Sequence, residues 1–336
     1  MIKLSVLDQS VAIEGHSQDQ SIRETLEFAK ICEELGYFRF WVSEHHNHPT
    51  IVGSAPEILM SAIAATTKTI RIGSAGVMLP HYSPLKVAEQ FRVLDAIAPG
   101  RIDMGLGRAP GSDGKTAYAL NPNAGTAGDQ FPSAVRDLMN WVSGEAMTEG
   151  HPFADIKAFP QGATRPQPWM LGTSDYGAQV AAHYGIPYSF AHFITDGRGV
   201  ERALQIYREN YQPSTAFPEP LASVCVWALA AETDEEARYL YASRAHNKVM
   251  RDYGKLSSLV SPDAALAYGY TSEQKTRFDQ LTADAVIGNV TKVSGQLKAL
   301  AKTYQIDEIV VLTWTHDQRA RKRSYELLAE AFDLNA

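Results

Sequence analysis

The chain has few cysteines and no long hydrophobic run. Its two cysteines, Cys32 and Cys225, lie in separate apolar stretches and match no metal-ligand spacing. We therefore predict two buried free thiols, as is usual in a reducing compartment. No stretch of eighteen apolar residues occurs, and residues 1–8 read as a strand, not as a basic segment followed by an apolar one. These absences predict a cytoplasmic protein that does not insert into a membrane.

An excess of basic residues is also missing. The 336 residues include 31 Lys and Arg against 38 Asp and Glu, which gives a formal net charge of −7. Nucleic acids and anionic membrane surfaces are bound by basic surfaces, so we expect neither as the main partner. Any small anion that the protein binds must therefore be captured by a local site.

Strand-like and helix-like segments alternate regularly along the chain. Continuous apolar runs predict strands that are buried on both faces, and they occur at residues 3–7, 38–42, 70–78, 102–106, 168–171, 187–191, 223–230 and 308–312. Helical spacing of apolar residues lies between or after them, at residues 21–35, 55–66, 84–97, 176–184, 199–211, 290–304 and 319–332. Repeated strand–helix units form a parallel sheet, and eight of them fit a closed barrel better than an open sheet. We predict an α/β protein, a single (β/α)8 TIM-barrel domain over residues 1–336.

Two segments interrupt this alternation. Residues 109–129 follow the fourth strand, are rich in Gly, Asn, Pro and Ala, and show no apolar period. Residues 255–287 are polar and follow the helix after the seventh strand. Insertions in a barrel cluster at the carboxyl ends of the strands, where active sites form. We predict a loop insertion at 109–129 and a lid at 255–287.

The second strand runs into Ser43-Glu44-His45-His46-Asn47-His48. Three histidines and a glutamate suggest a metal site, but adjacent side chains at a strand end diverge and no second ligand motif accompanies them. We therefore expect no metal. The histidines either cap the next helix and pack on the barrel rim, or at least one of them faces a ligand.

Small residues and one arginine end the third and fourth strands. Ala75 and Gly76 either leave space for a flat group close to the backbone or reflect tight packing of strand against helix. Residues 105–111, Gly-Leu-Gly-Arg-Ala-Pro-Gly, are similar to a dinucleotide-binding fingerprint, but Pro110 replaces the third glycine and no helix starts there. With that interpretation rejected, Arg108 either pairs with a phosphate or carboxylate or forms a surface ion pair.

The fifth strand ends in Gly172-Thr173-Ser174, directly before a predicted helix. Free backbone N–H groups, two hydroxyls and the positive end of the helix dipole favour an anion at this point. Ser174 is alternatively a simple helix N-cap. If an anion binds, Arg108 is the nearest candidate counter-charge along the rim.

Together and in this order, these strand-end motifs resemble those of the luciferase-like flavin-dependent monooxygenases, in particular luciferase-like oxidoreductases of unknown substrate. The resemblance covers residues 2–111, 165–193 and 287–332. It implies that FMN binds across the carboxyl face, with its phosphate at Arg108 and in the Gly172-Thr173-Ser174 turn. It also implies that the ring lies against Ala75 and Gly76, joined by a non-prolyl cis peptide bond. In such a site His45 acts on the oxygenated flavin and Glu44 supports the pocket.

The same resemblance implies a two-component monooxygenase. A separate flavin reductase supplies reduced FMN as a co-substrate, and dioxygen is used to oxidise a small organic substrate. We place an apolar substrate pocket at Met78, Tyr82, Tyr188 and Phe190, and a homodimer interface at residues 55–66 and 84–97. Two alternatives remain: hydride transfer with the deazaflavin F420 on the same barrel, and flavin binding without turnover.

Overall fold

Eight parallel strands close into a barrel in the computed structural model, which describes residues 2–335 without the side chains of residues 124 and 125. The first strand closes the barrel because it pairs in parallel with both the second and the last strand. The barrel strands are β1 (Lys3–Asp8), β2 (Arg39–Val42), β3 (Arg71–Ser74), β5 (Ile102–Gly107), β6 (Gln167–Gly172), β7 (Tyr188–Phe190), β8 (Ala222–Ala231) and β10 (Glu308–Leu312). The predicted (β/α)8 barrel is confirmed.

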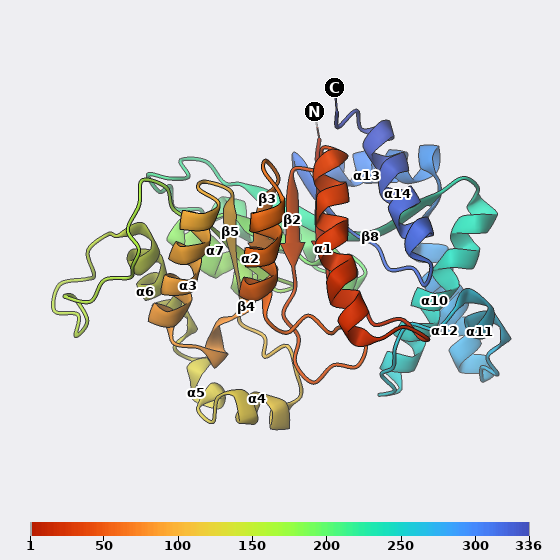
Figure 1. The fold of residues 1–336 in the computed structure, drawn as a ribbon, viewed down its shortest axis with the longest axis horizontal. Helices are drawn as coiled ribbons and strands as arrows, with labels where there is room; N and C mark the ends of the chain where they lie inside the picture. The colour runs from red at the N-terminus through yellow and green to blue at the C-terminus, as the bar shows by residue number, and fades with distance from the viewer. Residues whose placement is uncertain (1, 336) are drawn as a thin grey trace.

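Helices surround the barrel, and both chain ends lie together at one side of it (Figure 1). The long helices are α1 (Gln18–Glu34), α2 (Pro56–Thr66), α3 (Pro84–Ile97), α6 (Phe131–Ser143), α7 (Asp175–Tyr184), α9 (Val200–Glu209), α10 (Asp234–Asp252), α13 (Val290–Tyr304) and α14 (Gln318–Ala331). A 3-10 turn, η1 (Leu79–His81), and a short helix, α8 (His192–Thr195), follow strand ends. No range was predicted for α6 or α10. The other long helices agree with the predicted ranges to within a few residues.

The third predicted strand, residues 70–78, is divided in two. β3 ends at Ser74 and β4 (Val77–Met78) begins after Ala75 and Gly76, which are joined by a cis peptide bond. The Ser74 hydroxyl donates to the carbonyl oxygen of Gly105 at 2.9 Å and accepts from its N–H at 3.0 Å. This pair of bonds fixes β3 to β5 directly beneath the break.

Both interrupting segments are folded, so the expectation of irregular loops is wrong. Residues 109–129 contain α4 (Gly114–Leu120) and α5 (Ala124–Ala127), and residues 255–287 contain α11 (Pro262–Ala267), α12 (Ser272–Asp284) and the start of β9 (Val286–Asn289), which extends the sheet beside β8. Figure 1 shows α4 and α5 below the barrel and α11 and α12 at its lower right, on the side toward which β2 points. The insertions therefore lie at the carboxyl end of the barrel, as predicted.

The amino end of the barrel is filled by a buried ion cluster. Arg39 donates to Asp103 at 2.9 Å and to Glu308 at 2.8 Å, and Asp103 also accepts from Arg71 and from the indole N–H of Trp41. Both carboxylates are paired, so the centre of this end is a filled structural core. The opposite end carries the carboxyl ends of the strands, where the ligand site of such a barrel is expected.

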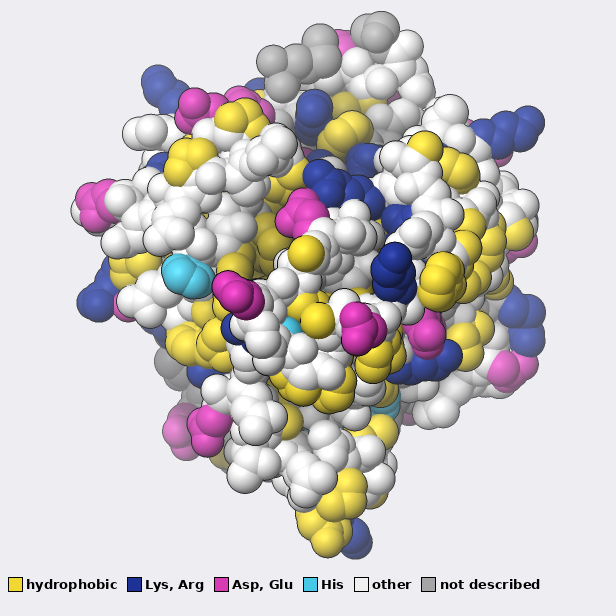
Figure 2. All heavy atoms as spheres, turned by 90° about the vertical axis from the view of Figure 1, so that its left-hand side faces the viewer, with side chains coloured by type: hydrophobic (Ala, Val, Ile, Leu, Met, Phe, Trp, Pro, Cys, Tyr) yellow, Lys and Arg dark blue, Asp and Glu magenta, His cyan; other side chains and the backbone are white. Residues whose placement is uncertain are grey.

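One face of the molecule shows mixed charge. Basic and acidic side chains are interspersed over the face shown in Figure 2, with no field of one sign. Cys32 and Cys225 are free and buried, as predicted. Among residues 2–335, no helix combines the length and the hydropathy needed to cross a membrane.

The lid role of residues 255–287 stays a prediction. Leu256 lines the barrel mouth, whereas Phe278 and Leu281 of α12 are buried against the rest of the molecule. We expect amide hydrogen exchange in this segment to slow when reduced FMN binds, most strongly at residues 255–261, because these lie nearest the mouth. Exchange that is as slow as in the barrel strands and unchanged by FMN would exclude a lid.

Candidate active site

A cavity of about 440 Å³ opens at the carboxyl ends of the barrel strands. Its lining comes from nearly every strand end and from α7 and α10, and it includes Gln9, Trp41, His45, His48, Ala75, Gly76, Met78, Arg108, Gly172, Thr173, Ser174, Arg244, Asn247, Arg251 and Trp314. Seven of the eight residues predicted to act in catalysis or cofactor binding are among them, and Glu44 is the exception. No aspartate or glutamate of residues 2–335 lines the cavity, whereas three arginines do.

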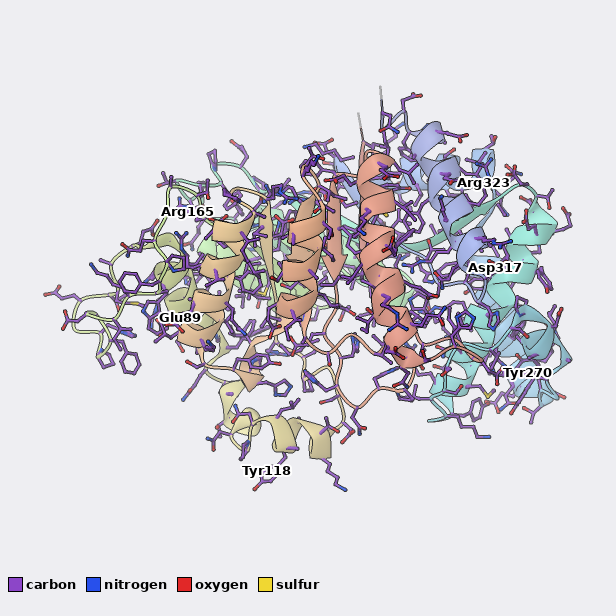
Figure 3. The ribbon with its side chains drawn as sticks, in the orientation of Figure 1. Glu89, Tyr118, Arg165, Tyr270, Asp317 and Arg323 are labelled. Carbon is purple, nitrogen blue, oxygen red and sulfur yellow. The ribbon has the colours of Figure 1, made fainter. Side chains whose placement is uncertain are left out.

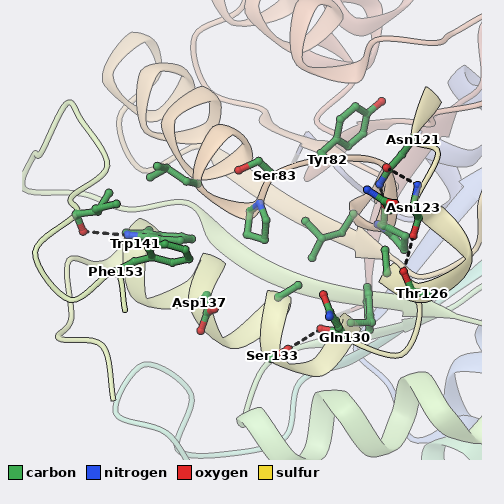
Figure 4. Close-up of a pocket in the computed structure, with 18 residues that line it drawn as sticks. Tyr82, Ser83, Asn121, Asn123, Thr126, Gln130, Ser133, Asp137, Trp141 and Phe153 are labelled. Atoms are coloured by element: carbon green, nitrogen blue, oxygen red, sulfur yellow. Dashed lines mark hydrogen bonds between the residues drawn. The ribbon is translucent and has the colours of Figure 1, made fainter. Parts of the chain in front are cut away.

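A second cavity of about 440 Å³ lies on the flank of the barrel, beside η1, α3 and α6 (Figure 4). Its carboxylate, Asp137, lies 3.3 Å from Nε2 of His151, and the indole N–H of Trp141 donates to Ile156 at 3.0 Å. Because these polar groups are already paired and none of the eight described barrel strands contributes a lining residue, we place the active site in the barrel mouth.

The predicted substrate pocket is largely wrong. Only Met78 of its four residues lines the barrel mouth. Tyr82 lines the flank cavity, and Tyr188 and Phe190 are fully buried in the core. Alternation along a strand explains the error, because side chains of the same strand point alternately into the barrel and toward the surrounding helices.

The break between β3 and β4 forms one wall of the mouth. A side chain at Gly76 would place its Cβ 2.7 Å from Leu171 Cδ1 and 2.8 Å from the Gly105 carbonyl oxygen. Only glycine fits there, so this wall is bare backbone next to the small side chain of Ala75. The packing interpretation of the motif is therefore confirmed at Gly76, while a flat group lying against this bare wall stays a prediction.

Arg108 follows β5, and its side chain lies against the start of α7 on another side of the mouth. Its guanidinium carbon is 4.0 Å from the centre of the Tyr176 ring, which belongs to the first turn of that helix. It forms no ion pair with any described carboxylate, so the surface ion-pair interpretation fails. Asp175, the acidic residue at the helix start, pairs with Arg202 at 2.8 Å.

The turn before α7 leaves its polar groups available. Ser174 is the N-cap residue by position, but its side chain makes no capping hydrogen bond. Thr173, Ser174 and Arg108 all line the cavity, and the Arg108 guanidinium lies against Tyr176, so these residues border one corner of the cavity at the start of α7. Such a corner suits a phosphate.

His45 faces the cavity with an unsatisfied ring. Its Nδ1 is buried and has no hydrogen-bond partner within residues 2–335. Burial, followed by the neighbouring His48 and His46, lowers the pKa of His45 from 6.5 to about 4. The ring is therefore neutral at physiological pH. A neutral imidazole still offers one N–H donor and one lone pair.

Glu44 does not reach the cavity. Its carboxylate, 1% exposed, accepts hydrogen bonds from the Tyr82 hydroxyl at 2.6 Å and from the Met78 N–H at 3.0 Å, and it lies 2.8 Å from Nε2 of His46. Burial and the bond to Glu44 raise the pKa of Tyr82, which keeps the hydroxyl protonated as a donor. Glu44 thus ties the end of β2 to β4 and holds the loop that carries His45.

His48 serves both interpretations of the histidine motif. Its Nδ1 accepts from the backbone N–H groups of Thr50 at 3.2 Å and Ile51 at 3.0 Å, and the ring also lines the cavity. The three histidines do not form a metal site with the other side chains: among the residues that the structure describes, no group of three or more His, Cys, Asp or Glu could hold a metal ion.

The sequence interpretation missed one side of the mouth. Arg244, Asn247 and Arg251 of α10 line it, together with Trp314, which follows β10. Helical spacing was the available signal, because positions i, i+3 and i+7 share one face of a helix. Two further polar atoms there are buried without partners in the described chain, Oε1 of Gln9 and Nε1 of Trp314. Unpaired buried groups around one cavity can be completed by a bound polar group.

Comparison with known proteins agrees with this geometry. The family described as luciferase-like monooxygenase matches residues 2–304. The chain belongs to this family. An uncharacterized protein of Bacillus subtilis, YwcH, is a family relative 41% identical over 99% of each chain. A second relative from B. subtilis, named N-acetyl-S-alkylcysteine monooxygenase, is 36% identical over 98% of each chain.

Several solved structures share the fold. Apo-MsnO8 matches with a TM-score of 0.90 and 36% identity over 99% of each chain. The oxygenating constituent of 3,6-diketocamphane monooxygenase from Pseudomonas putida, in complex with FMN, gives a TM-score of 0.73 at 17% identity, over 98% of this chain and 97% of that one. An F420-dependent secondary alcohol dehydrogenase gives 0.71 at 13% identity, over 98% of each chain. At these low identities the last two show the barrel alone.

The pKa of His45 predicts a pH effect on stability. The folded ring has a pKa of about 4 and the unfolded ring one near 6.5, so the unfolded state binds more protons between these values. The free energy of unfolding should rise with pH across this window because of His45. In His45→Gln, urea denaturation at a series of pH values should show a shallower rise, with a glutamine at exposed His183 as the control. Parallel curves for the parent and His45→Gln would contradict the burial effect.

Proposed function

We propose that the protein is a flavin-dependent monooxygenase of the two-component type, which uses reduced FMN and dioxygen to oxidise a small organic substrate. The observation that carries this is the barrel mouth, in which a phosphate corner and a flat backbone wall face one cavity. Family membership and the monooxygenase name of a 36% identical relative support it.

The residues present fit FMN. Arg108, Thr173 and Ser174 would hold the phosphate at the start of α7, with Gly172 leaving room for the backbone turn. Ala75 and Gly76 would bound the ring, because no side chain projects from Gly76. When bound and reduced, FMN supplies the activation of dioxygen; the protein supplies orientation, a dry cavity and proton handling.

We assign the proton-handling role to His45. Its neutral ring borders the cavity, and the unpaired Nδ1 awaits a partner that a bound molecule could provide. By donating or accepting a proton, this ring would assist the reaction of dioxygen with the substrate as a general acid or base. Glu44 acts as a positioning residue, since its carboxylate is bonded to Tyr82, Met78 and His46 and does not reach the ligand.

The reduced flavin would come from a separate flavin reductase. The structural neighbour from P. putida is named an oxygenating constituent, which supports this division of labour. A homodimer through α2 and α3 also remains a prediction. Exposed Ile58 on α2 and Val93 and Ile97 on α3 supply the apolar surface that such an interface requires.

Visible spectroscopy of the purified protein tests the proposal. FMN and F420 are added separately, reduced, and then exposed to oxygen in the presence of thioether and ketone substrates. We expect FMN to bind, and oxygen to be consumed with formation of an oxygenated product. Tight F420 binding with hydride transfer and no oxygen uptake would identify the deazaflavin alternative. Bound flavin that reoxidises without product from any substrate would identify flavin binding without turnover.

A further inference from the structure

One face of α10 presents polar side chains to the barrel mouth. Arg244, Asn247 and Arg251 are spaced i, i+3 and i+7, so they lie along the same side of the helix, and all three line the cavity. Arg244 and Asn247 are buried, with 3% and 6% of their surfaces exposed, while Arg251 lies toward the opening. Buried arginine and asparagine are rare without partners, so their placement calls for a ligand.

Arg244 is held in a fixed orientation. Its guanidinium carbon lies 3.9 Å from the centre of the Trp314 ring, which also lines the cavity. Stacking uses the face of the guanidinium and leaves its N–H donors free in the plane. The Nε1 of Trp314, a further donor, is buried without a partner in the described chain. These donors match an acceptor with two oxygen atoms, such as a carboxylate.

No protein carboxylate neutralises this face. Arg244 forms no ion pair within residues 2–335, and Arg251 has only a weak one, 3.9 Å from Asp252. Asp196, in a neighbouring cavity that Arg244 also borders, is engaged by Lys248 and lies 4.0 Å from Arg277. Burial lowers the pKa of Arg244 to about 10, which leaves it charged at neutral pH. The face therefore carries uncompensated positive charge.

The FMN phosphate does not account for this charge. Its proposed corner lies at the ends of β5 and β6, where Arg108 meets α7. The α10 face lies after β8 and beside the residue that follows β10, farther round the barrel. Arg108 and the α10 face are two cationic regions at different strand ends of one cavity, and each favours an anionic group. The FMN phosphate would occupy the first, so an anionic group of the substrate would occupy the second.

We propose that Arg244, Asn247 and Arg251 form a carboxylate-binding subsite, and that the substrate is an organic acid with an apolar body. The apolar part would lie against Trp41, Leu171 and Phe193, which line the same cavity. This inference rests on the proposed function, because it treats the phosphate corner as occupied by FMN. It goes further by naming the chemical class of the substrate.

Isothermal titration of the full-length protein with octanoate and its uncharged isostere, octanamide, tests the subsite with and without FMN. We expect octanoate to bind at least about 10-fold more tightly than octanamide. Arg244→Met and Arg251→Met should each weaken octanoate about 10- to 100-fold, the range for a hydrogen bond to a charged group, and leave octanamide nearly unchanged. Arg238→Met is the matched control, because Arg238 lies on α10 but is half-exposed and pairs with Glu235.

Thermal melting of each variant shows whether Arg244→Met fails to fold. In that case Arg251→Met, which changes an exposed side chain, still tests the subsite. The proposal is overturned if octanoate binds no better than octanamide, or if Arg251→Met binds octanoate like the parent. It is also overturned if either variant loses its preference for FMN over riboflavin, because α10 would then hold the phosphate. Arginine-dependent octanoate binding in a protein that binds no FMN would support the subsite and contradict the proposed function.

Discussion

Replacing His45 by alanine is expected to lower coupled product formation about 10²- to 10⁴-fold, the usual contribution of a general acid–base group. The ring borders the barrel mouth with a buried, unpartnered Nδ1, so its removal deletes a proton donor or acceptor next to the reaction. FMN affinity and melting temperature should change little. Product yield and peroxide release, measured with excess reductase and followed by a melting curve, separate a chemical defect from unfolding.

Alanine at His46 and His48 provides the comparison. His46 is bonded to Glu44 and His48 accepts two backbone N–H bonds, so both act mainly on loop structure and should cost less product than His45. Because the His45 pKa is about 4, the parent should keep a flat activity profile from pH 6 to 8 as far as this residue is concerned. If His45→Ala retains full coupling, or loses activity only by unfolding, the residue is structural.

The barrel could be predicted because its strands are short and buried on both faces. Segments such as β1 and β10 are continuous apolar runs, and helical spacing between them leaves few other arrangements. The strand-end motifs then placed Ala75, Gly76, Arg108 and the turn before α7 on one rim. This followed from topology alone, since the carboxyl ends of parallel strands meet at the same end of a barrel.

The helices that were missed within the two interrupting segments are polar or short. α12 is fixed by a capping box between Thr271 and Gln274, and it buries only a few side chains, such as Phe278 and Leu281. α4 spans seven residues and begins at the Asp113 N-cap. Local hydrogen bonds of this kind leave little trace in an apolar pattern, so both segments read as loops.

Contacts between distant residues set the site's electrostatics, and these could not be read along the chain. Arg108 stacks on Tyr176, and Arg244 stacks on Trp314, seventy residues farther along the sequence. The neutral state of His45 likewise depends on burial by several elements. The sequence identified the strand-end residues of the rim but not those of α10, and packing decides which side chains of the rim are charged, paired or free.

Replacing Arg108 by alanine should weaken FMN binding by about 1.5–3 kcal/mol, or about 10- to 150-fold in Kd. The guanidinium forms no ion pair with a described carboxylate and lies beside the start of α7, where Thr173 and Ser174 also line the cavity. Riboflavin, which lacks the phosphate, should bind the variant and the parent nearly equally. Flavin fluorescence quenching measures all four affinities.

The comparison with riboflavin also separates the loss of phosphate binding from any structural effect of the substitution. Losing Arg108 deletes its contact with Tyr176, and any resulting shift of α7 would affect both flavins alike. Arg108→Lys should fall between the parent and alanine, because it keeps the charge but not the planar fork that binds two phosphate oxygens. Alanine at Arg165, an exposed arginine outside the cavity (Figure 3), should leave both affinities unchanged. Equal losses for FMN and riboflavin in Arg108→Ala would instead show that the residue shapes the mouth without binding the phosphate.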